Sequence, residues 1–300
     1  MDEGTDDVGQ IQDEARAAPP TGKNLGLLSS KNQCQAKTIE YHGGPVMTGT
    51  PDVYVIWYGN WSNAAASQSI LSDFLTEVGG SPYFQLNARY TNGSGQGPSG
   101  SMLFGGSVTD AYSHGTALSD ADLADVVARQ INTNGLPQDP GGIYVVIASP
   151  DVTATSGFCS RYCGQHGSGE ALGSPFRFIF VGNASRCMST CAYQRTVSPN
   201  GNPAADAMVN ILANELSTTV TDPTLGAWHD RSGLENADKC AWNFGTTYST
   251  SNGAKANIRL GGRDYLIQQN FWPTSRGGVC VMSSSQAAAA VAAGLDRHGP

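Results

Sequence analysis

Six of the seven cysteines constrain this 300-residue chain more than any other feature. They form two pairs with the same close spacing and one wider pair downstream: Cys159 and Cys163, Cys187 and Cys191, and Cys240 and Cys280. Cysteines this close together usually form disulfides or metal sites. Zinc sites of this kind tend to come with a basic surface or additional histidines. This chain has a formal net charge of -8 and few histidines, so we predict three disulfides and an oxidising, extracellular environment.

The connectivity of these cysteines is less constrained than their oxidation. Pairing within each close pair is feasible, because residues four apart in a loop can bring their Cα atoms within the roughly 4.4 to 6.8 Å that a disulfide requires. A tight loop gains little entropy from closure, so a Cys240–Cys280 link should stabilise the fold most, by about 4 kcal/mol. Three alternatives remain open for the seventh cysteine, Cys34: a free thiol, a disulfide between two chains, or competition with one of the assigned partners.

Glycosylation acceptors agree with export. The chain contains three Asn-x-Ser sequences, at Asn60, Asn92 and Asn183. Together with the cysteines they indicate a secreted glycoprotein. The first stretch, Met1–Pro20, is acidic and polar, which is the opposite of a secretory signal. The signal of an exported chain would therefore be removed or replaced in this numbering.

The composition argues against two classes of partner. No run of about 18 apolar residues is present, so we expect no membrane span. Binding to nucleic acid needs clustered Lys and Arg. Only 17 such residues occur, and they are dispersed, which argues against a nucleic-acid partner.

The chain divides into three parts. Residues 1–37 are acidic at first, then rich in Ala and Pro, and predict a flexible tail. Residues 38–282 are expected to form the folded domain, and 283–300 a low-complexity, Ala-rich tail that forms at most a weakly held helix. The Gly- and Ser-rich segment 90–106 predicts a long connection.

Strand and helix patterns alternate within the domain. Short β-branched and aromatic runs predict three strands: Val53–Tyr58, Gly142–Ala148 and Phe176–Val181. Apolar residues at helical spacing predict three helices: Gln68–Val78, Ser119–Asn132, with Ser119 as N-cap, and Pro203–Val220. We therefore predict an α/β fold, a layered single domain with a mixed central sheet flanked by helices and with disulfide-stapled loops.

The third predicted helix contains the first candidate for chemistry. Residues 214–218, Asn-Glu-Leu-Ser-Thr, occupy the frame of the zinc-protease sequence His-Glu-x-x-His. Both ligand positions are changed to Asn and Thr, which are poor zinc ligands. Glu215 lies on the apolar stripe, so it should be buried with a partner or a proton. The candidate partners are an Arg, His166 or a divalent cation, and the simplest interpretation is a structurally paired carboxylate.

Three further groups are candidates. Four carboxylates lie close together in a turn-rich segment: Asp222, Asp230, Glu235 and Asp238. Carboxylate oxygens of this kind bind calcium, although acidic residues in loops also cap turns. His42 and His166 each lie among glycines and either join Glu215 in a site or form structural hydrogen bonds. Three tryptophans are weaker candidates for carbohydrate binding, since tryptophan is more often in the core: Trp57, Trp61 and Trp228.

Several of these segments, in order, resemble the Exordium family, also called phosphate-induced proteins. The matching stretches run from about Tyr41 to Met282: residues 41–46, 55–59, 156–167, 180–183, 187–192 and 219–223, and Cys280. The resemblance implies a secreted, extracellular or cell-wall protein, associated with growth and cell expansion, in a family without a firmly assigned reaction. Some microbial relatives carry an intact His-Glu where this chain has Asn214 and Glu215. The resemblance thus suggests a metallopeptidase-like ancestor whose activity is weakened or gone.

Two hypotheses follow. The first, which we favour, is an extracellular binding or signalling module without turnover, whose partner is an unidentified extracellular protein or wall polysaccharide. The second is a metal-dependent hydrolase in which Glu215 acts as general base. In that case His42, His166 or Asp222 would supply ligands to a calcium or zinc ion; the sequence makes no cofactor certain.

Overall fold

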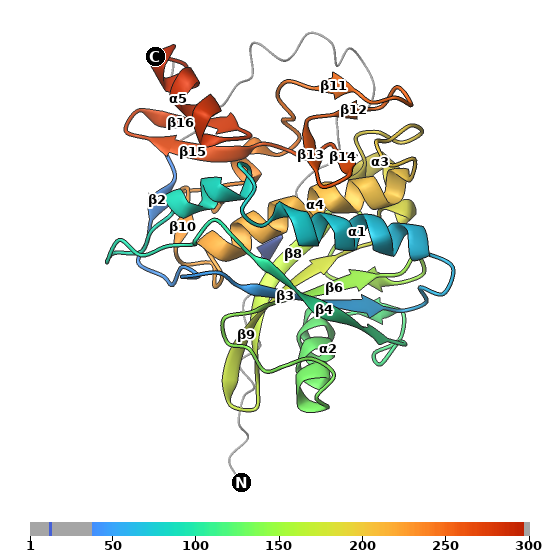
Figure 1. Ribbon diagram of the computed structural model, residues 1–300. Helices are drawn as coiled ribbons and strands as arrows, with labels where there is room; N and C mark the ends of the chain where they lie inside the picture. Colours follow the sequence, from blue (N-terminus) through green and yellow to red (C-terminus); the bar gives the residue numbers. More distant parts are fainter. Residues whose placement is uncertain (1–11, 14–37, 297–300) are drawn as a thin grey trace.

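A mixed sheet forms the centre of the molecule. The computed structural model describes residues 12–13 and 38–296 (Figure 1). The sheet has the strand order β1-β8-β9-β6-β3-β4. Its parallel strands are β3 (Asp52–Tyr58), β4 (Leu103–Asp110), β6 (Ile143–Ala148) and β9 (Ser174–Val181). Strand β8 (Gly164–Ala171) runs antiparallel to β9, and β1 (Gln12–Asp13) antiparallel to β8.

The three predicted strands and the three predicted helices are confirmed. The apolar runs of β3 and β6 are buried almost throughout, as expected of strands covered on both faces. Helices α1 (Ala65–Val78) and α4 (Pro203–Thr221) lie on one face of the sheet and α2 (Asp120–Asn132) on the other (Figure 1). Ser119 caps α2 in a reciprocal capping box with Asp122. The predicted layered α/β fold is therefore correct.

A further layer of short elements covers the outer side of α4. Paired strands make up much of it: β2 (Glu40–Tyr41) with β10 (Trp228–His229), β11 (Tyr248–Ser249) with β12 (Lys255–Ala256), β13 (Ile258–Leu260) with β14 (Arg263–Tyr265), and β15 (Asn270–Thr274) with β16 (Gly277–Val281). The remaining short elements are β5 (Ala117–Leu118), β7 (Thr153–Ala154), α3 (Met188–Cys191), α5 (Ser284–Ala292) and the 3-10 helices η1 (Phe84–Arg89), η2 (Ala184–Arg186) and η3 (Asp238–Cys240). Because α4 lies between this layer and the sheet, it is buried along nearly its whole length.

The disulfides differ from local pairing. The bonds are Cys159–Cys187, Cys163–Cys191 and Cys240–Cys280, with Cα–Cα distances of 5.6, 5.7 and 5.6 Å. Each cysteine of the first close pair thus bonds to a cysteine of the second close pair, and neither pair closes a tight loop of its own. The reason is strand β8, which the sequence pattern did not predict. One close pair precedes β8 and the other follows β9, and the antiparallel pairing of Gly164 with Val181 brings the two pairs side by side. The predicted Cys240–Cys280 bond is confirmed.

Cys34 and most of the predicted N-terminal tail lie outside the described residues. The predicted connection 90–106 ends earlier than expected, because β4 begins at Leu103. The predicted helix in the Ala-rich segment is present as α5. Within residues 12–13 and 38–296, no helix has the length and apolar character needed to cross a bilayer.

Candidate functional site

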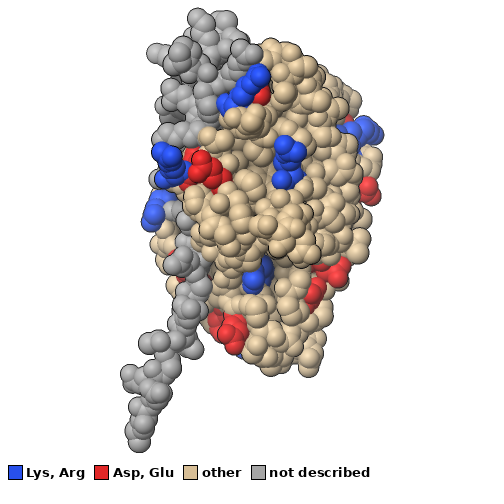
Figure 2. All heavy atoms as spheres, turned by 90° about the vertical axis from the view of Figure 1, so that its left-hand side faces the viewer, with Lys and Arg blue, Asp and Glu red and all other residues tan. Residues whose placement is uncertain are grey.

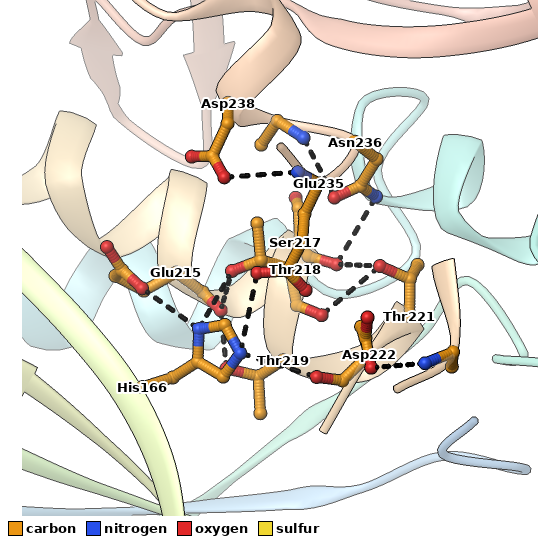
Figure 3. Close-up of polar contacts among 12 residues, drawn as sticks. His166, Glu215, Ser217, Thr218, Thr219, Thr221, Asp222, Glu235, Asn236 and Asp238 are labelled. Atoms are coloured by element: carbon orange, nitrogen blue, oxygen red, sulfur yellow. Dashed lines mark hydrogen bonds and ion pairs between the residues drawn. The ribbon is translucent and has the colours of Figure 1, made fainter. Parts of the chain in front are cut away.

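Helix α4 brings Glu215 against the sheet at a point where water has no access. The Glu215 side chain is 0% exposed. Close approach of α4 to β8 depends on Gly164, because a Cβ atom there would lie 2.5 Å from Ile211 Cγ2 and 3.2 Å from Glu215 Cγ. His166 lies two residues further along β8, so its side chain leaves the same face of the strand as Gly164 and points toward α4 (Figure 3).

The His166 ring lies between two carboxylates. Its Nδ1 atom is 3.3 Å from Glu215 Oε2 and 3.3 Å from Thr218 Oγ1. Its Nε2 atom is 3.3 Å from the main-chain oxygen of Asp222 and 3.6 Å from Glu235 Oε2. We call these five residues the His166 cluster (Figure 3). All five are buried, with exposed fractions of 0 or 1%.

The hydrogen bonds restrict the protons on the ring. The Asp222 carbonyl oxygen can only accept, so Nε2 carries a proton and donates it. Thr218 Oγ1 donates its own proton to the main-chain oxygens of Asn214 and Glu215, which leaves it as an acceptor for Nδ1. Both ring nitrogens therefore face acceptor oxygens, Nδ1 those of Glu215 and Thr218 and Nε2 those of Asp222 and Glu235.

The side-chain carboxylates of Asp222 and Asp238, which lie near the cluster, accept hydrogen bonds from neighbouring groups. Asp222 Oδ1 accepts hydrogen bonds of 2.7 Å from the backbone nitrogens of Gly226 and Ala227. Burial nevertheless raises the pKa of Asp222 above its ordinary value, since those two hydrogen bonds offset only part of the desolvation. Asp238 accepts from Asn214 Nδ2 and from the backbone nitrogen of Glu235, each at 3.3 Å. Asn214 thus binds a carboxylate where the zinc-protease sequence would have a histidine.

A buried amide network, which was not predicted from the sequence, adjoins the cluster. Asn87 Oδ1 accepts hydrogen bonds from Asn236 Nδ2 at 3.1 Å and from Asn270 Nδ2 at 2.8 Å. Asn236 Nδ2 also donates to the main-chain oxygen of Ser217, at 3.3 Å. The signal in the sequence is the polar run 217–219 on a helix that is buried along nearly its whole length. The network fixes η1 and the loop before η3 against α4.

The other predicted metal ligands lie apart from Glu215. His42 is exposed and stacks on His229, with ring centroids 3.8 Å apart. Asp230 forms a buried ion pair of 2.7 Å with Lys239. Burial acts to raise the pKa of Asp230, but the hydrogen bond and charge of Lys239 and the backbone hydrogen bonds from Ser232 and Leu234 together outweigh it, so the pKa is lowered. The four carboxylates predicted for calcium therefore do not converge on one point.

In the His166 cluster the carboxylates of Glu215 and Glu235 are arranged about the imidazole ring. Zinc needs donors about 2.0 to 2.3 Å from one point. Here the two glutamates face the ring nitrogens, and the ring occupies the space between them. Asn214 and Thr218 supply neutral oxygens only. Among the residues that the structure describes, no group of three or more His, Cys, Asp and Glu side chains is arranged to hold a metal ion.

The three acceptor asparagines differ in accessibility. Asn60 is exposed and Asn92 half-buried, and each accepts a hydrogen bond from the backbone nitrogen of the serine two residues on. Asn183 is buried, and its Nδ2 atom, which would carry a glycan, donates to the main-chain oxygen of Ala148 at 3.2 Å. The folded protein has no room for a glycan at Asn183.

The tryptophans do not form an exposed platform. Trp57 and Trp61 are buried and pack edge to face, with ring centroids 5.0 Å apart. Trp228 is half-buried between Tyr41 and Tyr90, and its Nε1 atom donates to the main-chain oxygen of Thr91. The carbohydrate site considered for these three residues is therefore not supported by their positions.

Charged side chains are sparse on the surface drawn in Figure 2. This face corresponds to the left-hand side of Figure 1. Lys and Arg occur there singly or beside acidic residues, separated by wide uncharged areas, and do not merge into one basic patch. The visible face therefore has no concentration of positive charge of the kind that phosphate backbones bind.

Fold and site together define a disulfide-linked α/β protein with a buried histidine–carboxylate cluster. Residues 39–265 match the family model described as the phosphate-induced protein 1 conserved region. The chain therefore belongs to the Exordium, or phosphate-induced, family. This family and the three disulfides are consistent with an extracellular protein.

Relatives in two plants have similar sequences. Exordium-like 5 of Arabidopsis thaliana is 31% identical over 241 residues, which cover 70% of this chain and 65% of that protein. Exordium of the same plant is 26% identical over 294 residues, 83% of this chain and 90% of the relative. Phosphate-induced 1 of Nicotiana tabacum is 28% identical over 225 residues, 66% of this chain and 69% of the relative. No solved structure gives a significant match.

Proposed function

We propose that this protein is secreted and acts in the extracellular space or cell wall as a binding or signalling module, without catalytic turnover. Its role is in growth-related or wall-related processes, in line with its family. The three disulfides support export, since such bonds persist in oxidising compartments. Membership of the Exordium family supports the biological setting.

The observation that carries the proposal is the complete burial of Glu215 and His166 in mutual contact. A general base must reach a water molecule and a substrate, within about 2.6 to 3.2 Å of the proton that it removes. Glu215 instead contacts an imidazole ring from the central sheet. We assign this carboxylate the role of holding α4 against β8.

The same contacts weigh against the hydrolase alternative. Both ligand positions of the zinc-protease frame carry neutral side chains, and Asn214 is engaged with Asp238. The His166 ring lies between Glu215 and Glu235, where an ion would otherwise have to bind. His42, which was expected to supply a further ligand, stacks on His229 instead.

Turnover and binding can be measured on the same protein. Purified protein would be incubated with a mixture of casein peptides and with isolated plant wall polysaccharides, and soluble products identified by mass spectrometry. We expect retention on wall material or on an extracellular protein without new products. The variants Glu215→Gln and, as a control on exposed β8 surface, Glu170→Gln should behave alike. Products formed by the native chain and lost only in Glu215→Gln would overturn the proposal.

A further inference from the structure

The short hairpins β11–β12 and β13–β14 border an open hollow on the outer layer, away from the His166 cluster. They lie beside each other above α1 and α4 in the view of Figure 1. The hollow has a volume of about 650 Å³. Small-molecule sites typically measure about 300 to 1,000 Å³ and combine an apolar surface with a few fixed polar groups. This hollow has both.

One aromatic side chain provides the apolar surface. Tyr248 lines the hollow and is 41% exposed, so part of its ring is open to a ligand. Its hydroxyl donates to Asp264 Oδ1 at 2.9 Å. Burial, followed by the contact with Asp264, raises the pKa of Tyr248 to about 12. The hydroxyl is protonated at physiological pH, and its hydrogen bond to Asp264 holds the ring in place.

The polar groups of the hollow are also fixed in place. Arg259 Nη1 lies 3.3 Å and 3.4 Å from the two carboxylate oxygens of Asp264. The main-chain oxygen of Asp264 accepts a hydrogen bond of 3.0 Å from Asn200 Nδ2. Asn257 Nδ2 donates to the main-chain oxygens of Phe244 and Ile267, which ties the start of β13 to the body of the protein. Hydrogen bonds to the rest of the domain thus support the floor of the hollow before any ligand binds.

The charges of the hollow balance. Arg259 and Asp264 are the only charged residues among those that line it, and they pair with each other. The Arg259 side chain is 62% exposed, so much of the guanidinium still faces solvent and can donate to a ligand. Ser249, Thr250 and Ser251 line the same hollow. Since this pair carries no net charge, the lining offers a neutral, hydroxyl-rich ligand both donors and acceptors.

We propose that this hollow binds a neutral saccharide, with the exposed Tyr248 ring against a sugar face and with Arg259 and Asp264 bonded to sugar hydroxyls. A pyranose ring presents C–H groups on its faces and hydroxyls around its rim. This combination matches an aromatic ring beside a paired guanidinium and carboxylate. The inference rests on the proposed extracellular binding function and names its ligand class.

Binding of soluble oligosaccharides tests the site. The full chain would be titrated calorimetrically with neutral hexasaccharides of β-linked glucose, mannose and arabinose, and with an anionic hexagalacturonate. We expect at least one neutral hexasaccharide to bind and the anionic one to bind more weakly. Tyr248→Ala should lower the affinity about tenfold, because it removes an aromatic contact. Tyr248→Phe keeps the ring and should retain most of the affinity.

Tyr193 offers a matched control. It is 39% exposed, close to the value for Tyr248, but it does not line this hollow. Tyr193→Ala should leave saccharide affinity unchanged, and the melting temperatures of all variants would be compared to confirm folding. The proposal is overturned if no neutral hexasaccharide binds, or if Tyr248→Ala binds as tightly as the native chain. If the native chain and Tyr248→Ala are retained equally on wall material, the proposed extracellular binding function stands and the proposed saccharide site is wrong.

Discussion

Removal of the His166 ring tests the central cluster of the fold. The change His166→Ala takes away the group that lies between Glu215 and Glu235 and leaves both carboxylates buried. Two like charges without the intervening ring repel each other, and neither can regain its hydration. We therefore expect a large loss of stability with the fold otherwise retained.

The magnitude follows from the burial of the three side chains. Breaking a buried charge pair by removing one partner costs about 3 to 5 kcal/mol. A loss of 1 kcal/mol lowers the melting temperature by roughly 2 to 4 °C in a domain of this size class. His166→Ala should therefore melt roughly 6 to 20 °C below the native protein. Because the cluster is buried, salt should change this difference little.

Urea and thermal unfolding followed by circular dichroism measure the effect. The matched control is His42→Ala, which removes an exposed histidine that stacks on His229 and forms a 3.1 Å hydrogen bond to its main-chain oxygen, and it should cost no more than about 1 kcal/mol. Adding Glu215→Gln to His166→Ala replaces one of the two carboxylates that face the ring in the native protein. The double variant should be more stable than the sum of the single effects by about 1 to 3 kcal/mol. Equal, small losses for His166→Ala and His42→Ala would refute the reasoning.

Three further changes test other parts of the account. Replacing Cys163 and Cys191 together by serine should cost roughly 2 to 3 kcal/mol. This is less than closing a 28-residue loop alone would contribute, because the neighbouring Cys159–Cys187 bond remains. Peptide mapping of the native protein without reduction should recover Cys159–Cys187 and Cys163–Cys191, and recovery of Cys159–Cys163 and Cys187–Cys191 would contradict the structure. Asp222→Asn removes a carboxyl group whose pKa is raised by burial. Relative to this variant, the native protein should be most stable below pH 3.8 and should lose stability as the pH rises through the raised pKa. Urea midpoints with the opposite pH trend would contradict this. Ser119→Ala should cost about 1 kcal/mol by removing the cap of α2, and an unchanged urea midpoint would contradict the capping box.

The sequence predicted those parts of the fold that follow from local patterns. The runs that became β3, β6 and β9 are β-branched and apolar enough to identify directly. Strand β8 is different, since its sequence Gly-Gln-His-Gly-Ser-Gly-Glu-Ala has no apolar alternation. It forms because β9 offers a partner and because glycine lets α4 approach closely. The crossed disulfides depend on β8, so spacing alone could not give their connectivity.

The candidate site was predicted in part for the same reason. The burial of Glu215 follows from its place on the apolar stripe of its helix, and His166 was among its candidate partners. Glu235 was grouped with three other carboxylates, but the fold places it beside His166. These residues come from three separate segments, and only their long-range packing brings them together. Asp230 could not be separated from the group in advance, because its pairing with Lys239 also depends on the folded loop.

Metal content tests the interpretation of the His166 cluster most directly. Zinc and calcium would be quantified by elemental mass spectrometry in protein purified without chelators or added metal. The account predicts far less than one ion per chain, and the same result for His166→Ala and Glu215→Gln. One tightly bound ion per native chain, lost in either variant, would contradict it.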